Sequence, residues 1–333
     1  MKSLVTGVAG FIGSHVGEHL LRMGHEVVGL DDLSGGFEDN VPLGTRFIRG
    51  SVTDTGLIEA LSQQEKFDYV FHLGAYAAEG LSHFIRHFNY SNNLLGTINL
   101  INAAVKTGVR CFVFTSSIAV YGKNQLPMVE DLTPRPEDPY GIAKYAVELD
   151  LAAAHEMFGL DYIIFRPHNV YGERQNIADK YRNVVGIFMN QILQDKPMTI
   201  FGDGSQTRAF SHIDDVAPII ARSPEVSQAF NRVFNVGADK PCSVLELAHI
   251  VAAAFNTPAR IEYLPPRDEV VHAFADHGRA HDVFHPTEPI PLEIGIKRMA
   301  KWARRMGPRA ALRFQHLEVS KNMPRSWRLS ESS

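Results

Sequence analysis

The chain has 333 residues, of which 45% are hydrophobic and 21% are charged, with a formal net charge of -4. These fractions are close to globular averages and exclude fibrous and low-complexity classes. The small negative charge gives no general attraction to nucleic acids or anionic membranes, so we expect neither as a partner.

The cysteines and the hydrophobic runs bear on cellular location. Only Cys111 and Cys242 are present, which indicates no disulfide framework. The chain starts with a strand-like segment rather than a signal peptide, and no run approaches the roughly 18 apolar residues of a membrane span. We therefore expect a cytoplasmic protein. Ten Lys and Arg with one acid lie between Lys297 and Arg328, which we interpret as a solvated helix and a loose tail.

The first segment has the order strand, glycine turn, helix. An apolar strand at Lys2–Thr6 leads into Gly7, Gly10 and Gly13, and a helical pattern follows from Ser14 to Met23. Glycines suit a tight turn in which the backbone approaches a pyrophosphate held by the positive end of a helix. The spacing is GxxGxxG rather than the commoner GxGxxG.

The second strand ends at an acid. A strand is predicted over His25–Leu30, and Asp31 follows it, 18 residues after Gly13. A carboxylate at this distance accepts hydrogen bonds from the adenosine ribose and repels a 2′-phosphate. The sequence therefore favours NAD over NADP.

Further strands alternate with helices along the chain. Helical periodicity is found at Thr55–Glu65 and Asn92–Thr107, and strands are predicted at Arg46–Ile48, Tyr69–Leu73, Cys111–Thr115 and Tyr162–Phe165. This alternation predicts an α/β fold with a Rossmann-like, doubly wound parallel sheet. Ligands in such sheets bind beyond the carboxyl ends of the strands, so residues that follow the strands are candidates for function.

Tyr140 and Lys144 are candidates for chemistry because they are four residues apart. On a helix they share one face. A lysine ammonium beside a phenol favours the phenolate, which brings tyrosine toward use as a general base. The same spacing is also that of a solvated lysine packed along an aromatic ring.

Beyond Gly172 the loops are longer and richer in proline, which predicts a smaller C-terminal α/β domain. We assign residues 1–172 to cofactor binding, with some later segments returning to that domain, and residues 173–307 mainly to substrate binding. The tail, 308–333, has no assigned role. Two arginines in the second part, Arg208 after a glycine turn and Arg267 after two prolines, suit phosphate contacts or surface ion pairs.

Taken together, these motifs resemble the extended short-chain dehydrogenase/reductase family, and within it the NAD-dependent nucleotide-sugar epimerases. The resemblance covers residues 1 to about 305. GxxGxxG is the family's own glycine pattern, TSSIAVYG at 115–122 is similar to its serine motif, and Tyr140 with Lys144 forms its YxxxK. RPHNVYG at 166–172 and the segment containing Arg208 resemble its nicotinamide and phosphate contacts.

The resemblance implies the following site. Catalysis is assigned to Ser117, Tyr140 and Lys144, and tightly bound NAD, regenerated in each turnover, to Gly7, Gly10, Phe11, Ile12, Gly13, Asp31, Asp32, Ser34, Val52, Leu73, Gly74, Ala75, Tyr140, Lys144 and His168. Substrate contacts are assigned to Ser117, Tyr140, Asn169, Arg208, Arg267 and Glu79. His168 either tunes the substrate pocket or packs, and Glu79 either contacts a sugar hydroxyl or is an exposed loop carboxylate.

The implied reaction inverts C4 of a nucleotide-linked hexose through a 4-keto sugar. A UDP-glucose/UDP-galactose type of substrate is favoured, with N-acetylated or uronic sugars as alternatives. Related dehydratases and decarboxylases carry an acid shortly after the serine, where this chain has Ile118 and Ala119. Dehydratase, decarboxylase or reductase activity is the alternative within the family, and a non-catalytic NAD-binding regulator is the alternative outside it.

Two further expectations concern metals and assembly. His277, His281 and His285 are spaced by four, but Gly278 and Pro286 interrupt the helical pattern, so we expect no metal site. The resemblance implies a homodimer formed through the helices that start near Asn92 and Tyr140.

Overall fold

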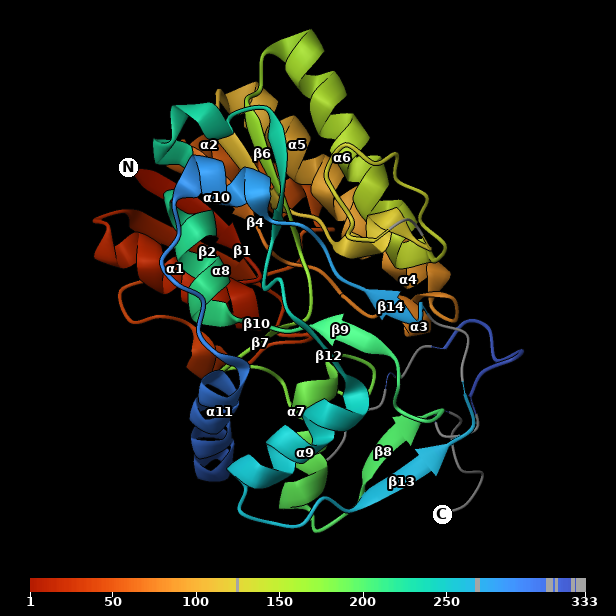
Figure 1. Cartoon of the computed structure of the whole chain (residues 1–333). Helices are drawn as coiled ribbons and strands as arrows, with labels where there is room; N and C mark the ends of the chain where they lie inside the picture. Colours follow the sequence, from red (N-terminus) through yellow and green to blue (C-terminus); the bar gives the residue numbers. More distant parts are fainter. Residues whose placement is uncertain (124–125, 267–269, 310–313, 315–316, 325–326, 328–333) are drawn as a thin grey trace.

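The computed structural model describes residues 1–123, 126–266, 270–309, 314, 317–324 and 327, and it has two lobes (Figure 1). The larger lobe is built on a seven-stranded sheet in the order β11-β6-β5-β4-β1-β2-β3. All its strand pairs are parallel, which confirms the predicted fold class. The strands are β1 (Lys2–Thr6), β2 (Glu26–Asp31), β3 (Arg46–Arg49), β4 (Tyr69–His72), β5 (Cys111–Thr115), β6 (Tyr162–Pro167) and β11 (Arg232–Val236).

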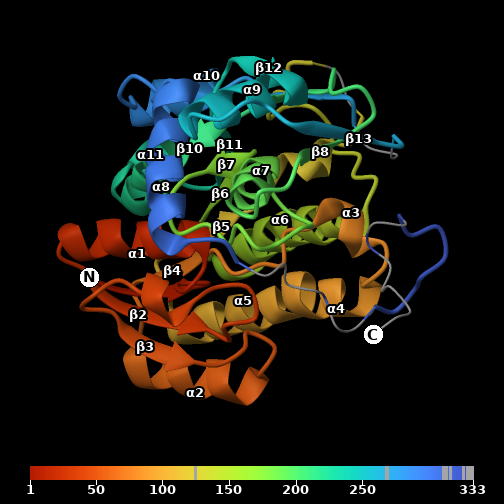
Figure 2. The same cartoon turned by 90° about the horizontal axis from the view of Figure 1, so that it is seen from below.

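Helices cover both faces of this sheet (Figure 2). One face packs against α1 (Phe11–Arg22), α8 (Ile213–Arg222) and α10 (Gly278–Phe284), and the other against α2 (Thr55–Glu65), α5 (Gly96–Thr107) and α6 (Pro139–Phe158). Successive residues of a strand point to opposite faces, so Leu4 and Val5 of β1 lie in different cores. This double burial explains why a central strand such as β5 is buried along its whole length, whereas the edge strand β3 is not.

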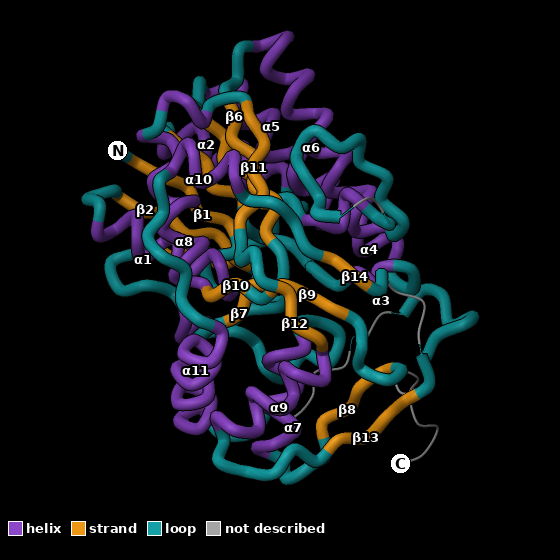
Figure 3. The backbone as a smooth tube through the Cα atoms, in the orientation of Figure 1, coloured by secondary structure: helices purple, strands orange, loops and turns teal. Residues whose placement is uncertain are grey.

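The smaller lobe contains mainly residues after 173. Its core is formed by β8 (Met198–Phe201), β13 (Ile261–Leu264), α7 (Val184–Leu193), α9 (Val244–Ala254) and α11 (Leu292–Met306). Short strands lie between this core and the large sheet (Figure 3), namely β7 (Val170–Tyr171), β9 (Thr207–Ala209), β10 (Ser211–His212), β12 (Pro241–Ser243) and β14 (His272–Ala273).

Short helices complete the fold. Two follow β4, α3 (Glu79–Ser82) and α4 (Arg86–Tyr90), and they lead into a π-helical turn, η2 (Ser91–Leu95). Single-turn 3₁₀ helices include η1 (Glu38–Asn40), η3 (Ile118–Tyr121), η4 (Ser223–Glu225) and η5 (Ser227–Ala229). Within the described residues, no helix combines the length and apolar character needed to cross a membrane.

Local sequence signals set several element boundaries. The helix expected at Thr55–Glu65 has those bounds, because the carboxylate of Asp54 accepts a hydrogen bond from the N–H of Leu57 (3.0 Å). The helix expected from Ser14 begins three residues earlier, because the N–H of Ser14 already bonds to the carbonyl of Gly10. The window expected as one helix, Asn92–Thr107, is divided into η2 and α5.

Candidate active site

The turn between β1 and α1 is too crowded for a side chain at two of its glycines. A Cβ on Gly13 would stand 2.0 Å from the carbonyl oxygen of Gly7, and a Cβ on Gly7 would stand 2.7 Å from the Cα of Gly74. Gly7 also has a φ of 73°, which disfavours other residues. The glycine backbone therefore leads directly into the N-terminus of α1. The free N–H groups at such a helix end can stabilise a pyrophosphate.

Asp31 lies beside this turn at the end of β2. Its carboxylate accepts hydrogen bonds from the N–H groups of Ala9 (3.0 Å) and Leu33 (2.8 Å). Burial raises the pKa of Asp31, and these two hydrogen bonds oppose the rise. The next acid, Asp32, accepts from the N–H of Ser34 (2.9 Å). Both carboxylates are thus held at the sheet edge next to the glycine turn.

One cavity of about 1470 Å³ follows the carboxyl ends of the strands. It is lined by every residue predicted to bind the cofactor, namely Gly7, Gly10, Phe11, Ile12, Gly13, Asp31, Asp32, Ser34, Val52, Leu73, Gly74, Ala75, Tyr140, Lys144 and His168. It is also lined by Ser117, Glu79, Asn169 and Arg208. Arg267 lies outside the described residues. The fold therefore brings all the described candidates to one site.

The first two turns of α6 carry Tyr140 and Lys144. Asp138 caps the helix by accepting from the N–H groups of Tyr140 (2.9 Å) and Gly141 (3.0 Å), and Pro139 occupies the first turn. Both side chains are almost fully buried, with Tyr140 5% and Lys144 1% exposed. The ammonium nitrogen of Lys144 lies 5.8 Å from the centre of the Tyr140 ring.

The end of β5 contacts Lys144 and carries Ser117. Lys144 Nζ donates to the carbonyl oxygen of Thr115 at the end of β5 (2.7 Å). Two residues later, Ser117 Oγ accepts from the N–H of Ala119 (3.1 Å) and forms a side-chain hydrogen bond with Tyr140. Serine, tyrosine and lysine therefore form a connected group at the carboxyl end of β5.

Burial changes the acid–base properties of this group. It raises the pKa of Tyr140, with a further rise from the charge of Glu79, while the hydrogen bond with Ser117 lowers it. Burial also lowers the pKa of Lys144 to about 7, although Glu148 acts in the opposite direction. The expected lowering of the Tyr140 pKa by Lys144 is therefore not found, because Lys144 is itself desolvated and partly loses its charge near neutral pH.

A buried ion pair supports the same segment from behind. Glu148, one turn after Lys144, accepts from Ser116 Oγ (2.5 Å) and from Arg166 Nε (3.0 Å) and Nη2 (2.5 Å). Arg166 also donates to the hydroxyl of Tyr121 (2.7 Å). This pair ties α6 to the ends of β5 and β6 and fixes the backbone that carries Ser117.

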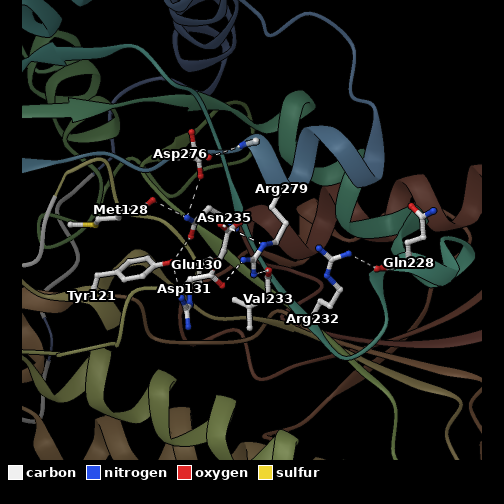
Figure 4. A network of polar contacts seen from close by, with 12 residues as sticks. Tyr121, Met128, Glu130, Asp131, Gln228, Arg232, Val233, Asn235, Asp276 and Arg279 are labelled. Carbon is white, nitrogen blue, oxygen red and sulfur yellow. Dashed lines mark hydrogen bonds and ion pairs between the residues drawn. The ribbon is translucent and has the colours of Figure 1, made fainter.

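The network continues to β11 through Tyr121 (Figure 4). Tyr121 donates to the amide oxygen of Asn235 (2.9 Å), whose amide nitrogen donates to the carbonyl oxygens of Met128 (3.1 Å) and Asp276 (3.2 Å). The N–H of Asn235 donates to Glu130 (2.8 Å). The ends of β6 and β11 are thus joined by side-chain hydrogen bonds through Tyr121, in addition to their backbone pairing in the sheet.

Three candidate substrate residues occupy different parts of the cavity wall. Glu79 starts α3, and its charge acts on Tyr140. Asn169 follows β6 and has a φ of 41°. Arg208, on β9, donates to the carbonyl oxygens of Val271 (2.8 Å) and Val270 (2.5 Å). Glu79 is solvent-exposed at the cavity wall, so its contact with a sugar hydroxyl stays a prediction.

The family model for the NAD dependent epimerase/dehydratase family matches residues 3–237. The chain belongs to this family. Its relatives include the UDP-glucose 4-epimerase of Mycolicibacterium smegmatis, 36% identical over 91% of this chain and 99% of that protein. The UDP-glucuronate 4-epimerase of Thermodesulfobacterium geofontis is 30% identical over 90% of this chain and 95% of that protein.

Solved structures of similar proteins agree in fold. The UDP-glucose 4-epimerase of Thermotoga maritima, solved with UDP-glucose, has a TM-score of 0.88 and 33% identity, covering 92% of this chain and 99% of that one. The UDP-glucose 4-epimerase of Thermus thermophilus, solved with NAD, has a TM-score of 0.84 and 30% identity, covering 91% and 98%. The chain is thus similar over nearly the whole length of both proteins.

His168 begins a chain of hydrogen bonds that runs from the cavity wall to the exposed side chain of Asp239. Its Nδ1 lies 3.2 Å from the carbonyl oxygen of Ala209, and its Nε2 lies 2.9 Å from Nε2 of His277. His277 Nδ1 in turn lies 2.6 Å from the carboxylate of Asp239. Burial lowers the pKa of His168 to about 3, so we assign it as neutral. It therefore packs in a fixed orientation at the cavity wall.

The histidine cluster considered from the sequence is divided by the fold. His277 bonds to His168 and Asp239, while His285 lies at the far end of α10 with a φ of 43°. Across the described part of the chain, no group of three or more His, Cys, Asp or Glu is arranged to hold a metal ion.

Sequence reasoning missed Arg182, which lies in the cavity wall. Its guanidinium is 4.8 Å from the centre of the Tyr76 ring, and its Nε donates to Asp179 (2.6 Å). Its charge lowers the pKa of Tyr140, opposing Glu79. Arg182 belongs to a loop without a recognisable motif, so only the folded chain brings it to the site.

Proposed function

We propose that the chain is an NAD-dependent 4-epimerase of nucleotide-linked hexoses, with UDP-glucose and UDP-galactose as the favoured type. The observation that carries this proposal is the composition of the cavity. It joins Ser117, Tyr140 and Lys144 to the glycine turn, whereas Ile118 and Ala119, which line the same wall, offer no second acid. The similarity to UDP-glucose 4-epimerases supports the same choice.

The residues at the glycine turn fit NAD. The turn has no room for side chains at Gly7 and Gly13, which suits a pyrophosphate at the N-terminus of α1, and the carboxylate of Asp31 suits ribose hydroxyls. NAD, when bound, would accept a hydride from C4 of the sugar and later return it. We propose that residues 1–172, with β11, hold NAD tightly through each turnover, and that residues 173–307 contribute mainly to binding the nucleotide sugar.

The proton transfers fall to Tyr140 and Ser117. Tyr140, as the phenolate, takes the proton of the sugar 4-hydroxyl while the C4 hydride leaves, which gives a 4-keto sugar. Ser117 donates a hydrogen bond to the same oxygen and stabilises the charge that develops on it. Burial raises the pKa of Tyr140 and lowers that of Lys144, so Lys144, held in place by Thr115, favours the phenolate only while it carries its charge.

In the second half of the reaction, the 4-keto sugar has to rotate while its diphosphate stays bound in the cavity. The keto sugar rotates about its bond to the diphosphate, receives the hydride on its other face and recovers the proton from Tyr140. We assign retention of the diphosphate to Asn169, Arg208 and Arg267. A guanidinium binds phosphate oxygens through two parallel hydrogen bonds, which suits Arg208 at the cavity wall.

One observation favours a second candidate, a nucleotide-sugar 4,6-dehydratase. Removal of water requires an additional acid or base beside the 4-keto sugar, and Glu79 is a carboxylate in the cavity whose charge reaches Tyr140. Epimerisation leaves the mass of the substrate unchanged, whereas dehydration removes one water. Product mass therefore separates the two candidates.

The test is incubation of the purified protein with UDP- and dTDP-sugars, without added cofactor, followed by mass spectrometry and proton NMR. We expect interconversion of C4 epimers at constant mass in the wild type. Tyr140→Phe should retain NAD and lose most of the turnover. The control is Tyr145→Phe, on the same helix but outside the cavity wall, which should keep its activity. Normal turnover in Tyr140→Phe would refute the mechanism.

We also propose a homodimer formed through η2 and α6. Large apolar side chains are exposed on these neighbouring helices, with Leu95 58%, Leu149 55% and Ile142 42% exposed. A second copy of the chain would cover them by the isologous pairing that is commonest among homodimers.

A further inference from the structure

Several described residues beyond α11 lie beside the cavity. Just after α11, the N–H of Arg309 donates to Asn190 Oδ1 (3.0 Å), and its carbonyl oxygen accepts from Asn190 Nδ2 (3.0 Å) and Gln194 Nε2 (2.8 Å). The guanidinium of Arg309 lies 4.2 Å from the centre of the Phe37 ring. The start of the tail is thus attached to α7 of the smaller lobe and reaches a loop of the larger lobe.

The following described residues, Phe314, 317–324 and Trp327, are called the C-terminal segment. They lie against α3 and α4 of the larger lobe, as the dark blue chain shows in Figures 1 and 2. The carboxylate of Glu318 accepts from the N–H groups of His87 (2.7 Å) and Phe88 (2.8 Å). The N–H of Glu318 also donates to the carbonyl of Phe84 (2.9 Å). Glu318 therefore satisfies free N–H groups in the first turn of α4.

Two aromatic side chains fix the segment on the apolar surface beside the site. The Phe314 ring lies 5.3 Å from that of Tyr76 and 4.8 Å from that of Phe88. The Trp327 ring lies 5.2 Å from that of Tyr181 and is only 6% exposed. Rings at these separations attract one another in addition to the apolar area that they bury. The expectation of a loose, solvated tail is therefore wrong for Met323 and Trp327, which are buried, whereas residues 318–322 are exposed.

The C-terminal segment is also part of the cavity wall. Val319, Lys321, Asn322, Pro324 and Trp327 line the same cavity as Tyr140. The Trp327 ring lies 3.0 Å from the position that a Cβ on Gly80 would take. Gly80 follows Glu79, whose charge reaches Tyr140. Trp327 is therefore placed at the end of the cavity where the reacting part of the sugar is expected.

We infer that the C-terminal segment is a component of the substrate site, in which Trp327 supports the wall around the hexose and holds the Glu79–Gly80 turn in place. This inference rests on the proposed function. While the 4-keto sugar rotates, it makes no hydrogen bonds to Tyr140 and Ser117, so other residues have to keep it in the cavity. Trp327 retains it by narrowing the cavity beside the Glu79–Gly80 turn, where its ring lies against Gly80 and Tyr181.

Tryptophan fluorescence can test the position of the segment during binding. The chain contains two tryptophans, and Trp302 packs against the core of the smaller lobe. Trp302→Phe therefore leaves Trp327 as the single reporter. In NAD-loaded Trp302→Phe/Tyr140→Phe protein, we expect UDP-glucose to change the emission saturably, with the same Kd that calorimetry gives. Calorimetric binding without any change in emission would overturn the inference.

Substitution of Trp327 tests its contribution to affinity. In the NAD-loaded Tyr140→Phe background, we expect Trp327→Ala to weaken UDP-glucose binding at least tenfold, about 1.4 kcal/mol. Binding of UDP, which lacks the hexose, should change much less. The control is Ser320→Ala, an exposed position of the same segment outside the cavity wall, which should bind both ligands as before.

The outcomes separate this inference from the proposed function. Equal UDP-glucose affinity in Trp327→Ala and its parent would overturn the inference and leave the epimerase proposal intact. Equal loss of UDP and UDP-glucose binding, or loss of NAD, would show a general structural role and would also overturn it. A parent protein that binds no nucleotide sugar would overturn the proposed function, and this inference with it.

Discussion

Replacing Glu148 with glutamine should destabilise the protein strongly, because the change leaves a buried cation without its anion. The side chains of Arg166 and Glu148 are only 4% and 5% exposed, and Arg166 donates to both carboxylate oxygens. Removing one partner of such a buried pair costs about 3–5 kcal/mol. We expect a loss of that size in the free energy of unfolding for Glu148→Gln.

Equilibrium unfolding in urea, followed by circular dichroism, measures this loss. The matched control is Glu156→Gln, an exposed position on the same helix, which should change the free energy by less than about 0.5 kcal/mol. The double variant Glu148→Gln/Arg166→Met removes both charges, so it should be more stable than Glu148→Gln alone. A loss below about 1 kcal/mol in Glu148→Gln, the value of an exposed pair, would refute the reasoning.

Two further predictions concern proton transfer and assembly. Glu79→Gln removes a negative charge that raises the pKa of Tyr140, so the rise of kcat/KM with pH should move to lower pH; an unchanged or more alkaline profile would contradict this. Sedimentation should give twice the 37.1 kDa chain mass for the wild type and the single-chain mass for Leu149→Arg. The control Tyr263→Arg, at an exposed site in the smaller lobe, should remain dimeric. A monomeric wild type would refute the dimer proposal.

The parts of the fold that local chemistry determines could be predicted from the sequence. The apolar run Cys111–Thr115 is a buried strand with the predicted bounds. The GxxGxxG spacing predicted a tight turn, and at Gly7 and Gly13 a side chain would indeed clash with the backbone. Gly7, Gly74, Ser117 and His168 line one cavity because they come shortly after parallel strands, and parallel strands end at the same edge of the sheet.

The missed features depend on contacts between distant residues. His168 bonds to a histidine 109 positions later, and nothing in either local sequence indicates that pairing. The pKa of Tyr140 was misjudged because spacing shows that Lys144 is near but not that both groups are desolvated. The C-terminal segment resembles a loose basic tail until its aromatic residues are placed against Tyr76 and Tyr181.

The position of β11 constrains how the protein can be made. This strand covers the outer edge of β6, yet it is synthesised after much of the smaller lobe, including α7 and β8. Until residue 236 has emerged from the ribosome, β6 presents a row of unpaired backbone groups, and Tyr121 lacks its partner Asn235. An exposed strand edge of this kind recruits other chains. A fragment that stops at residue 172 should therefore aggregate, even though it contains the glycine turn and the catalytic residues.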